Sequence, residues 1–191
     1  MNELVFDIET KNSFADVGGR DNLKALEVSV IGAYSYKEDR YFFFTESELP
    51  AFGELARGAD VLVGFSSRRF DVPILEKYFN FNIAALSQFD ILEEIEGAMG
   101  KRISLDLLAR ANLPGAEGKS ASGMDAIAFY RRGEMEKLKE YCLQDVKVTK
   151  NVFDLIRSQG YLWIPQKYQA QMIKLPIIYK EKEVPAQSRL I

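Results

Sequence analysis

The chain has 191 residues, 47% hydrophobic and 28% charged, with a formal net charge of −3, no histidine and a single cysteine. This length supports one well-buried core rather than two domains, and the small negative charge disfavours a bulk polyanion-binding module. Without histidine there is no Ser-His-Asp triad and no imidazole metal ligand, and one cysteine excludes a disulfide framework and a multi-cysteine zinc site. The single cysteine best fits a reducing, cytoplasmic compartment. We expect no membrane span, because the apolar stretches are only strand-length.

Five apolar runs of strand length follow one another in the first half of the chain. Valine, isoleucine, phenylalanine and tyrosine are common in them, as in buried strands, and they cover residues 3–9, 27–36, 40–45, 60–65 and 86–91. A polar turn at 37–39 joins the second and third runs, and the polar segment 11–26 is predicted to be a loop. Helical spacing of apolar residues predicts helices at 47–57 and 71–78.

The second half of the chain is predicted to be mostly helical. Helical patterns cover residues 92–99, 104–111, 125–131 and 134–158, and a loop rich in glycine and serine covers 114–123. This order of elements favours an α/β domain with a mixed five-stranded sheet, a leading antiparallel meander and flanking helices. We place the domain at residues 1–160. Residues 161–191, with a strand-like run at 174–179, form a C-terminal extension that either packs on the domain or engages a protein partner.

The first predicted strand carries two acidic residues, Asp7 and Glu9, inside an apolar run. Side chains two positions apart on a strand point to the same face, so the two carboxylates crowd one another. A divalent cation relieves such repulsion, and hard oxygen ligands favour Mg²⁺ or Mn²⁺ over zinc. The alternative is a solvated strand end, which the apolar neighbours disfavour.

A third acid, Asp71, follows the strand at 60–65 and a short turn, and it opens a helix. This geometry delivers a side chain to the carboxyl end of a strand, where open α/β sheets bind ligands. The alternative is that Asp71 only caps the helix.

A tyrosine and a fourth acid, Tyr141 and Asp145, lie four residues apart on the long last helix. That spacing places the phenol and the carboxylate on one helix face, and nearby apolar positions turn this face toward the core. The alternative is a core tyrosine bonded to a surface aspartate. Cys142, between them, is predicted to be a small buried residue rather than a nucleophile.

Taken together, these motifs resemble those of the DEDD superfamily of 3′-5′ exonucleases. The order Asp-x-Glu, Phe-Asp and Tyr-x-x-x-Asp is the same, and the tyrosine at 141 is similar to the tyrosine branch of that superfamily. The stretches Phe-Asp-Ile-Glu-Thr and Tyr-Cys-Leu-Gln-Asp-Val are similar to proofreading domains of family B DNA polymerases and to their stand-alone bacterial relatives. The resemblance covers residues 3 to 156 and implies a ribonuclease-H-like fold.

The resemblance also implies roles for individual residues. Tyr141 would orient the attacking water in an in-line displacement at phosphorus, and the two divalent cations, Mg²⁺ or Mn²⁺, would be held by Asp7, Glu9, Asp71 and Asp145. Substrate contacts are implied at Thr10, Ser66, Phe70 and Lys119. In one departure, the family's second motif carries an asparagine three or four residues before Phe-Asp, where this chain has Ser66 and Ser67. Serine has a shorter reach, which affects the substrate contact more than the metal site.

The expected function is hydrolysis of phosphodiester bonds at the 3′ end of single-stranded nucleic acid, with release of nucleoside 5′-monophosphates. DNA is favoured over RNA by the likeness to polymerase proofreading domains. One alternative is a non-catalytic module that binds nucleic acid and recruits a partner, which the presence of all four acids and Tyr141 disfavours. The other is a ribonuclease-H-type endonuclease, which is disfavoured because Tyr141 suits a water beside a free 3′ terminus.

Overall fold

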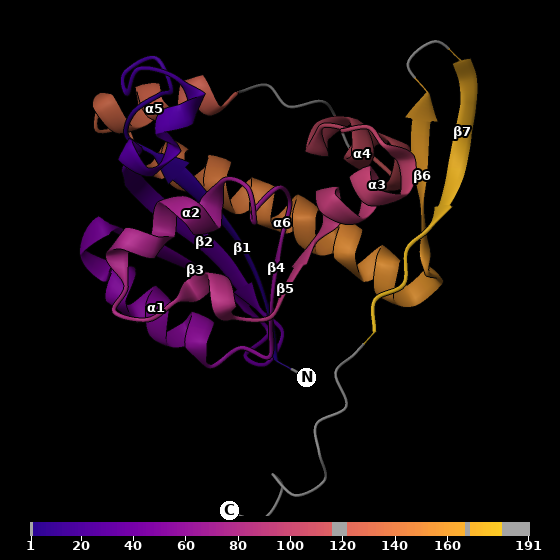
Figure 1. The fold of residues 1–191 in the computed structure, drawn as a ribbon, viewed down its shortest axis with the longest axis horizontal. Coiled ribbons are helices and arrows are strands. Elements are labelled where there is room, and N and C mark those ends of the chain that lie inside the picture. Colours follow the sequence, from indigo (N-terminus) through magenta and orange to yellow (C-terminus); the bar gives the residue numbers. More distant parts are fainter. Residues whose placement is uncertain (1, 116–121, 167–168, 181–191) are drawn as a thin grey trace, which may run out of the picture.

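A five-stranded mixed sheet forms the centre of the computed structural model, which describes residues 2–115, 122–166 and 169–180 (Figure 1). The strand order is β3-β2-β1-β4-β5. Antiparallel pairing joins β1 to β2 and β2 to β3, whereas β4 runs parallel to both β1 and β5. The strands span Glu3–Thr10 (β1), Val28–Ser35 (β2), Arg40–Thr45 (β3), Val61–Gly64 (β4) and Gln88–Asp90 (β5). The predicted sheet, with its leading meander, is confirmed.

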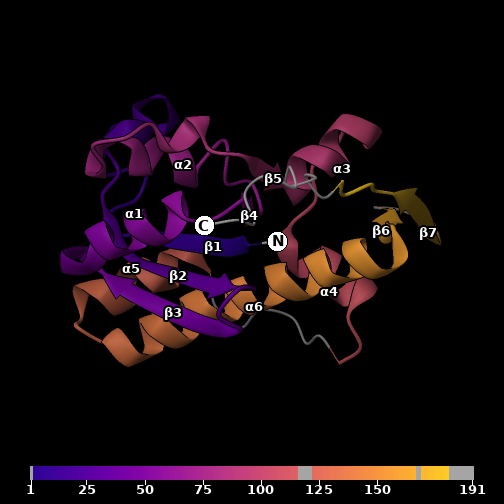
Figure 2. The same ribbon diagram turned by 90° about the horizontal axis from the view of Figure 1, so that it is seen from below.

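Helices cover both faces of the sheet, because the inner strands are apolar on both sides (Figure 2). Leu4, Phe6 and Ile8 of β1 face the layer that contains α1 and α2, whereas Val5 faces α6. The helices span Leu49–Arg57 (α1), Asp71–Leu75 (α2), Ile91–Met99 (α3), Leu105–Asn112 (α4), Gly123–Arg131 (α5) and Met135–Gln159 (α6). In the described part of the chain, no helix is both long enough and apolar enough to cross a membrane.

The helix ends differ from the predicted ones by one or two residues, and two segments differ in kind. The predicted helix at 71–78 is α2 followed by a short 3-10 turn at Glu76–Tyr78, and the predicted loop at 11–26 contains a 3-10 helix at Arg20–Ala25. The long predicted helix is α6, which ends at Gly160 in the left-handed conformation, φ 72°. Glycine adopts this conformation without steric cost, so it is a natural stop signal.

The C-terminal extension forms an antiparallel hairpin of β6 (Tyr161–Gln166) and β7 (Gln169–Pro176), which lies beside α4 and the end of α6 (Figure 1). The predicted strand at 174–179 therefore overlaps β7 only in part, and β6 was not predicted. Leu162, Ile164 and Leu175 are buried in the same core cluster as residues of α6. The described part of the extension thus packs on the domain, and a protein partner bound through residues 161–191 stays a prediction.

Candidate metal centre and active site

Three carboxylates from distant parts of the chain meet at the carboxyl end of the central strand. Asp7 and Glu9 lie on β1 and Asp145 on α6, and one carboxylate oxygen of each lies within 4.8 Å of the others. Glu9 and Asp145 are buried, and Asp7 is half-buried. The predicted convergence of the first and third motifs is what the structure shows.

A glycine in β2 lets α6 approach closely enough for this convergence. Gly32 is paired with Asp7 across the sheet. A Cβ atom at Gly32 would lie only 2.9 Å from Val146 Cγ2 and 3.0 Å from Cys142 Sγ, closer than side chains pack. The Cys142 thiol also donates to the Asp7 carbonyl at 3.8 Å. Because Asp145 directly precedes Val146, this close contact carries its carboxylate to β1.

The chemistry of the cluster fits a hard divalent cation. Like charges this close in a partly buried place repel unless a positive charge lies between them, and carboxylate oxygens are the ligands of Mg²⁺ and Mn²⁺. Asp7, Glu9 and Asp145 are therefore the residues that would hold a metal. Cys142 does not compete for it, because burial raises the pKa of its thiol well above its usual value and keeps the sulfur neutral.

Tyr141 lies one helical turn before Asp145 and is half-buried beside the cluster. Burial raises the pKa of its phenol above the usual value of tyrosine, and the nearby Asp145, Glu9 and Asp7 carboxylates raise it further. The phenol therefore stays protonated near neutral pH and can donate a hydrogen bond. The predicted grouping of this tyrosine with three acids agrees with the structure.

Asp71 occupies a different position from the other three acids. It is buried, and its Oδ1 accepts a hydrogen bond from the backbone N–H of Ile8 at 3.1 Å. Ile8 lies between Asp7 and Glu9, beyond the last residue of β1 that pairs with β4, Val5. Asp71 thus satisfies a strand donor that β4 does not reach, while Phe70 occupies the N-cap position of α2. It is not a member of the three-carboxylate cluster among the described residues, and its role as a metal ligand stays a prediction.

The surroundings of Asp71 make its carboxyl easier to protonate than that of an exposed aspartate. Burial raises the pKa of its carboxyl to about 7, although the hydrogen bond from Ile8 opposes this shift. The nearby Asp90 carboxylate adds to the increase. A buried acid in this position would ionise more readily if a cation came close.

Asp90 is a positioning residue that the sequence reasoning missed. Its buried carboxylate accepts hydrogen bonds from the backbone N–H groups of Ser66 (2.9 Å), Arg68 (3.0 Å), Leu92 (3.0 Å) and Glu93 (3.2 Å). It thereby caps α3 and holds the loop between β4 and α2. An aspartate after an apolar run and just before a helical pattern is the signal that predicts such a cap.

A cavity of about 330 Å³ opens beside Glu9. Two predicted substrate residues, Thr10 and Phe70, line it, together with Ile8, Glu9, Asn12, Ser13, Phe14, Leu26, Ser122, Gly123, Met124 and Ile127. The Thr10 hydroxyl donates to the Asn12 carbonyl at 2.9 Å, so it also shapes the wall of the cavity. Phe14 meets Phe70 edge-on, with ring centroids 5.9 Å apart. Ser66 is not among the lining residues, and Lys119 lies outside the described part of the chain.

The protein is of the α/β class, with a mixed sheet covered by helices on both faces. The carboxylate cluster at the end of the central strand is a candidate site for a divalent cation. The chain belongs to the RNase H superfamily, which it matches over residues 4–157, and the predicted ribonuclease-H-like fold is thereby confirmed. No curated protein matches the chain.

Solved structures show the same fold in a much larger protein. The family B DNA polymerase from the hyperthermophilic archaeon Pyrobaculum calidifontis is similar, with a TM-score of 0.63 and 18% sequence identity. The match covers 82% of this chain but only 24% of the polymerase chain. The chain therefore corresponds to about a quarter of that relative, and at this identity the likeness shows the fold alone.

Proposed function

We propose that this protein is a metal-dependent 3′-5′ exonuclease of the tyrosine branch, which removes nucleoside 5′-monophosphates from the 3′ end of single-stranded nucleic acid. The observation that carries the proposal is the grouping of Asp7, Glu9 and Asp145 beside Tyr141, with Glu9 also lining a small cavity. Superfamily membership and the polymerase likeness support nuclease chemistry of this general kind. DNA is favoured over RNA on the basis of the polymerase likeness.

The cavity supports an exonuclease rather than an endonuclease. Its volume of about 330 Å³ is at the lower end of the range for small-molecule sites, about 300–1,000 Å³. Such a space suits one nucleoside, and Phe14 and Phe70 offer apolar ring surface to a base of any identity. A terminal nucleotide in the cavity would place its phosphate near Glu9, whereas a continuous duplex has no comparable single nucleotide to insert.

The residues of the chain have distinct roles in the proposed reaction. Bound divalent cations would neutralise charge that develops on the phosphate oxygens and on the leaving 3′ oxygen. Asp7, Glu9 and Asp145 would hold these cations, and Asp71 would support a second one. The protonated Tyr141 would donate a hydrogen bond to the attacking water and so fix its direction of approach. The apolar cavity would hold the departing nucleotide in line with that water.

A time course on matched 5′-labelled DNA and RNA oligonucleotides tests the proposal. With Mg²⁺ or Mn²⁺, the expected result is a ladder of products that shorten one nucleotide at a time from the 3′ end, faster for DNA. A circular single strand should stay intact, because it has no 3′ end. Cleavage of the circle would instead indicate an endonuclease, and binding without any cleavage would indicate the non-catalytic module.

A further inference from the structure

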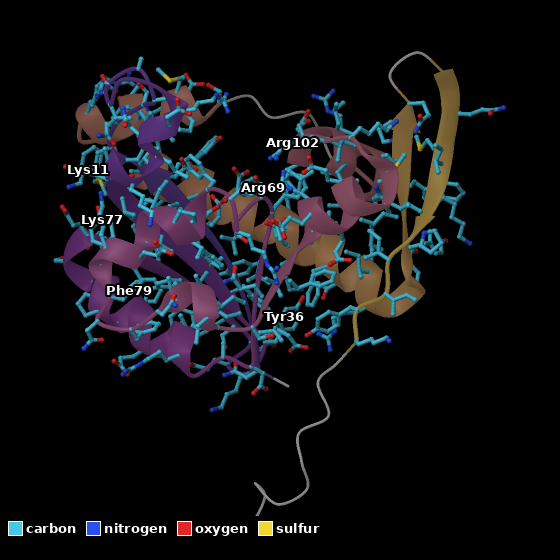
Figure 3. All side chains as sticks on the ribbon, viewed as in Figure 1. Lys11, Tyr36, Arg69, Lys77, Phe79 and Arg102 are labelled. Atoms are coloured by element: carbon cyan, nitrogen blue, oxygen red, sulfur yellow. The ribbon has the colours of Figure 1, made fainter. Side chains whose placement is uncertain are left out.

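Three arginines gather at the carboxyl end of β4 and β5, outside the site described above. Arg68 and Arg69 lie in the loop between β4 and α2, and Arg102 lies between α3 and α4. We call these three residues the basic rim. Their side chains are 48%, 51% and 48% exposed, so each guanidinium group is accessible to a ligand. Figure 3 shows Arg69 and Arg102 close together beyond the end of the sheet.

Two glutamates of α3 hold the basic rim together. Arg69 pairs with Glu96 at 2.7 Å, and Arg102 pairs with the same carboxylate at 3.5 Å. Glu93 lies 3.6 Å from both Arg68 and Arg69. Exposed ion pairs of this kind contribute little to stability. They do restrict three long side chains to one region, and this reduces the entropy lost when a ligand binds.

Arg102 has the most defined position of the three. Its Nη2 donates to the Ser66 hydroxyl at 2.9 Å. Ser66 itself has a left-handed backbone, with φ 67°, which is uncommon for a residue other than glycine. The Asp90 carboxylate holds the Ser66 N–H in this conformation. The strained serine thus presents its hydroxyl to an arginine from another segment of the chain.

The same loop connects the basic rim to the carboxylate cluster. Ser66 lies near the start of the loop, and Asp71, the first residue of α2, follows it and accepts a hydrogen bond from Ile8, between Asp7 and Glu9. The five residue steps from Ser66 to Asp71 span at most about 18 Å. Ser66, and the Arg102 side chain bonded to it, therefore lie within a few nucleotides' length of the acids. The guanidinium group is planar and carries five donors, a geometry that matches phosphate oxygens.

We propose that the basic rim binds backbone phosphates of the strand on the 5′ side of the bond that is cut, with Arg102, positioned by Ser66, as its principal contact. This inference rests on the proposed exonuclease function. A nucleic acid that approaches three clustered carboxylates in a protein of net charge −3 is repelled, and the rim provides local positive charge beside them. It binds without reading bases, as phosphate contacts do.

The test compares Arg102→Ala with wild type on two substrates. On a ten-nucleotide DNA strand, the variant should show a KM raised about tenfold with little change in kcat, as expected from loss of one charge-assisted contact. A dinucleotide without a 5′ phosphate contains only the scissile phosphate, so its hydrolysis should not change. Binding of the labelled ten-nucleotide strand, measured without metal, should show a salt slope that is lower by about 0.7.

Two further variants separate positioning from charge. Ser66→Gly suits the left-handed backbone and removes the hydroxymethyl side chain that accepts from Arg102, so it should raise the KM for the longer strand by a smaller factor than Arg102→Ala. Arg40→Ala is the matched control, because Arg40 is also an exposed arginine paired to a glutamate, Glu38. It begins β3 at the opposite end of the sheet, and its loss should change neither substrate's kinetics.

Two results would overturn the role of the rim. One is equal kinetics and equal binding for the Arg102→Ala and Arg40→Ala variants on the ten-nucleotide strand. The other is an equal loss on the dinucleotide, which would place Arg102 at the reacting phosphate or in the fold. If wild type hydrolyses nothing, the proposed function fails, and the metal-free binding comparison still decides whether the rim holds nucleic acid.

Discussion

Helix α6 carries a carboxylate toward each end of the same sheet, and the two ends differ in how charge is balanced. Asp154 accepts from the Tyr36 hydroxyl at 2.6 Å and pairs with Lys150 at 2.7 Å, near the start of β1. Asp145, nine residues earlier, instead joins Asp7 and Glu9 within 4.8 Å. The first arrangement balances charge with groups of the chain and supports the fold. The second concentrates like charge, which suits a cation from outside the chain.

Removal of an acid at the Asp145 end should have the largest effect. Asp7→Ala and Asp145→Asn are each expected to lower the rate of hydrolysis by at least about 10³-fold, or about 4 kcal/mol of barrier. The melting temperature without metal should stay equal or rise, because repulsion is relieved. The stabilisation by Mn²⁺ seen in wild type should disappear. Asp154→Asn, on the same helix, should keep the activity, and a comparable loss there would refute the distinction between the two ends.

The fold-supporting end includes the C-terminal hairpin. A large-to-small substitution in the core of this hairpin should therefore reduce stability rather than activity. Leu162 is fully buried beside α6, and Leu162→Ala should lower the free energy of unfolding by about 3 kcal/mol. Chemical denaturation measures this loss, and hydrolysis at low temperature should be unchanged. Ile178, which is 73% exposed, gives a matched control, because Ile178→Ala removes far less buried surface. Equal losses in both variants would contradict the packing role.

Tyr141→Phe should separate catalysis from metal binding at the Asp145 end. Loss of the phenolic donor is expected to slow hydrolysis by about 10²-fold, while the carboxylates remain in place. The rise in melting temperature on adding Mn²⁺ should equal that of wild type. At a Mn²⁺ concentration of 100 times the dissociation constant, this rise corresponds to a stabilisation of about 2.7 kcal/mol. An unchanged rate would remove the tyrosine from the mechanism.

The smallest effect is expected from Tyr36→Phe at the opposite end. The lost hydrogen bond to Asp154 should reduce the free energy of unfolding by about 1 kcal/mol near pH 7, with no change in hydrolysis. Burial, with Asp154 nearby, raises the pKa of Tyr36 in the folded protein. Tyrosine in the unfolded chain ionises near pH 10, so this stabilisation is complete below about pH 10 and declines above it. Denaturation curves from pH 7 to 11 should show the two proteins converging, and a constant gap would contradict the assignment.

Most of the sheet and the three-acid cluster could be predicted from local patterns. Apolar runs identified the five strands, and the spacing of Tyr141 and Asp145 identified one helix face. The hairpin strand β6 was missed, because its apolar run at 161–164 is only four residues long and is followed at once by Pro165, which disfavours a strand. Tertiary contacts decided its conformation.

The residues around the cluster depend on contacts that no local pattern encodes. Phe14 reaches the cavity from a polar loop, and Asp90 holds a loop more than twenty residues away. The position of Asp71 also could not be read from the sequence, because its acceptor role depends on where β4 stops alongside β1. Local spacing therefore predicted which acids meet, and packing decides how they are presented.

The glycine opposite Asp7 has a consequence for any search for inactivating changes in this protein. Gly32 has no functional group, yet a single added methyl would press on Val146 and Cys142 and push α6 away from β1. Such a substitution would separate Asp145 from its two partners while every acid remained intact. Inheritance of the four acids and the tyrosine would then be insufficient for activity, since an atom that must be absent matters as much as the oxygens that must be present.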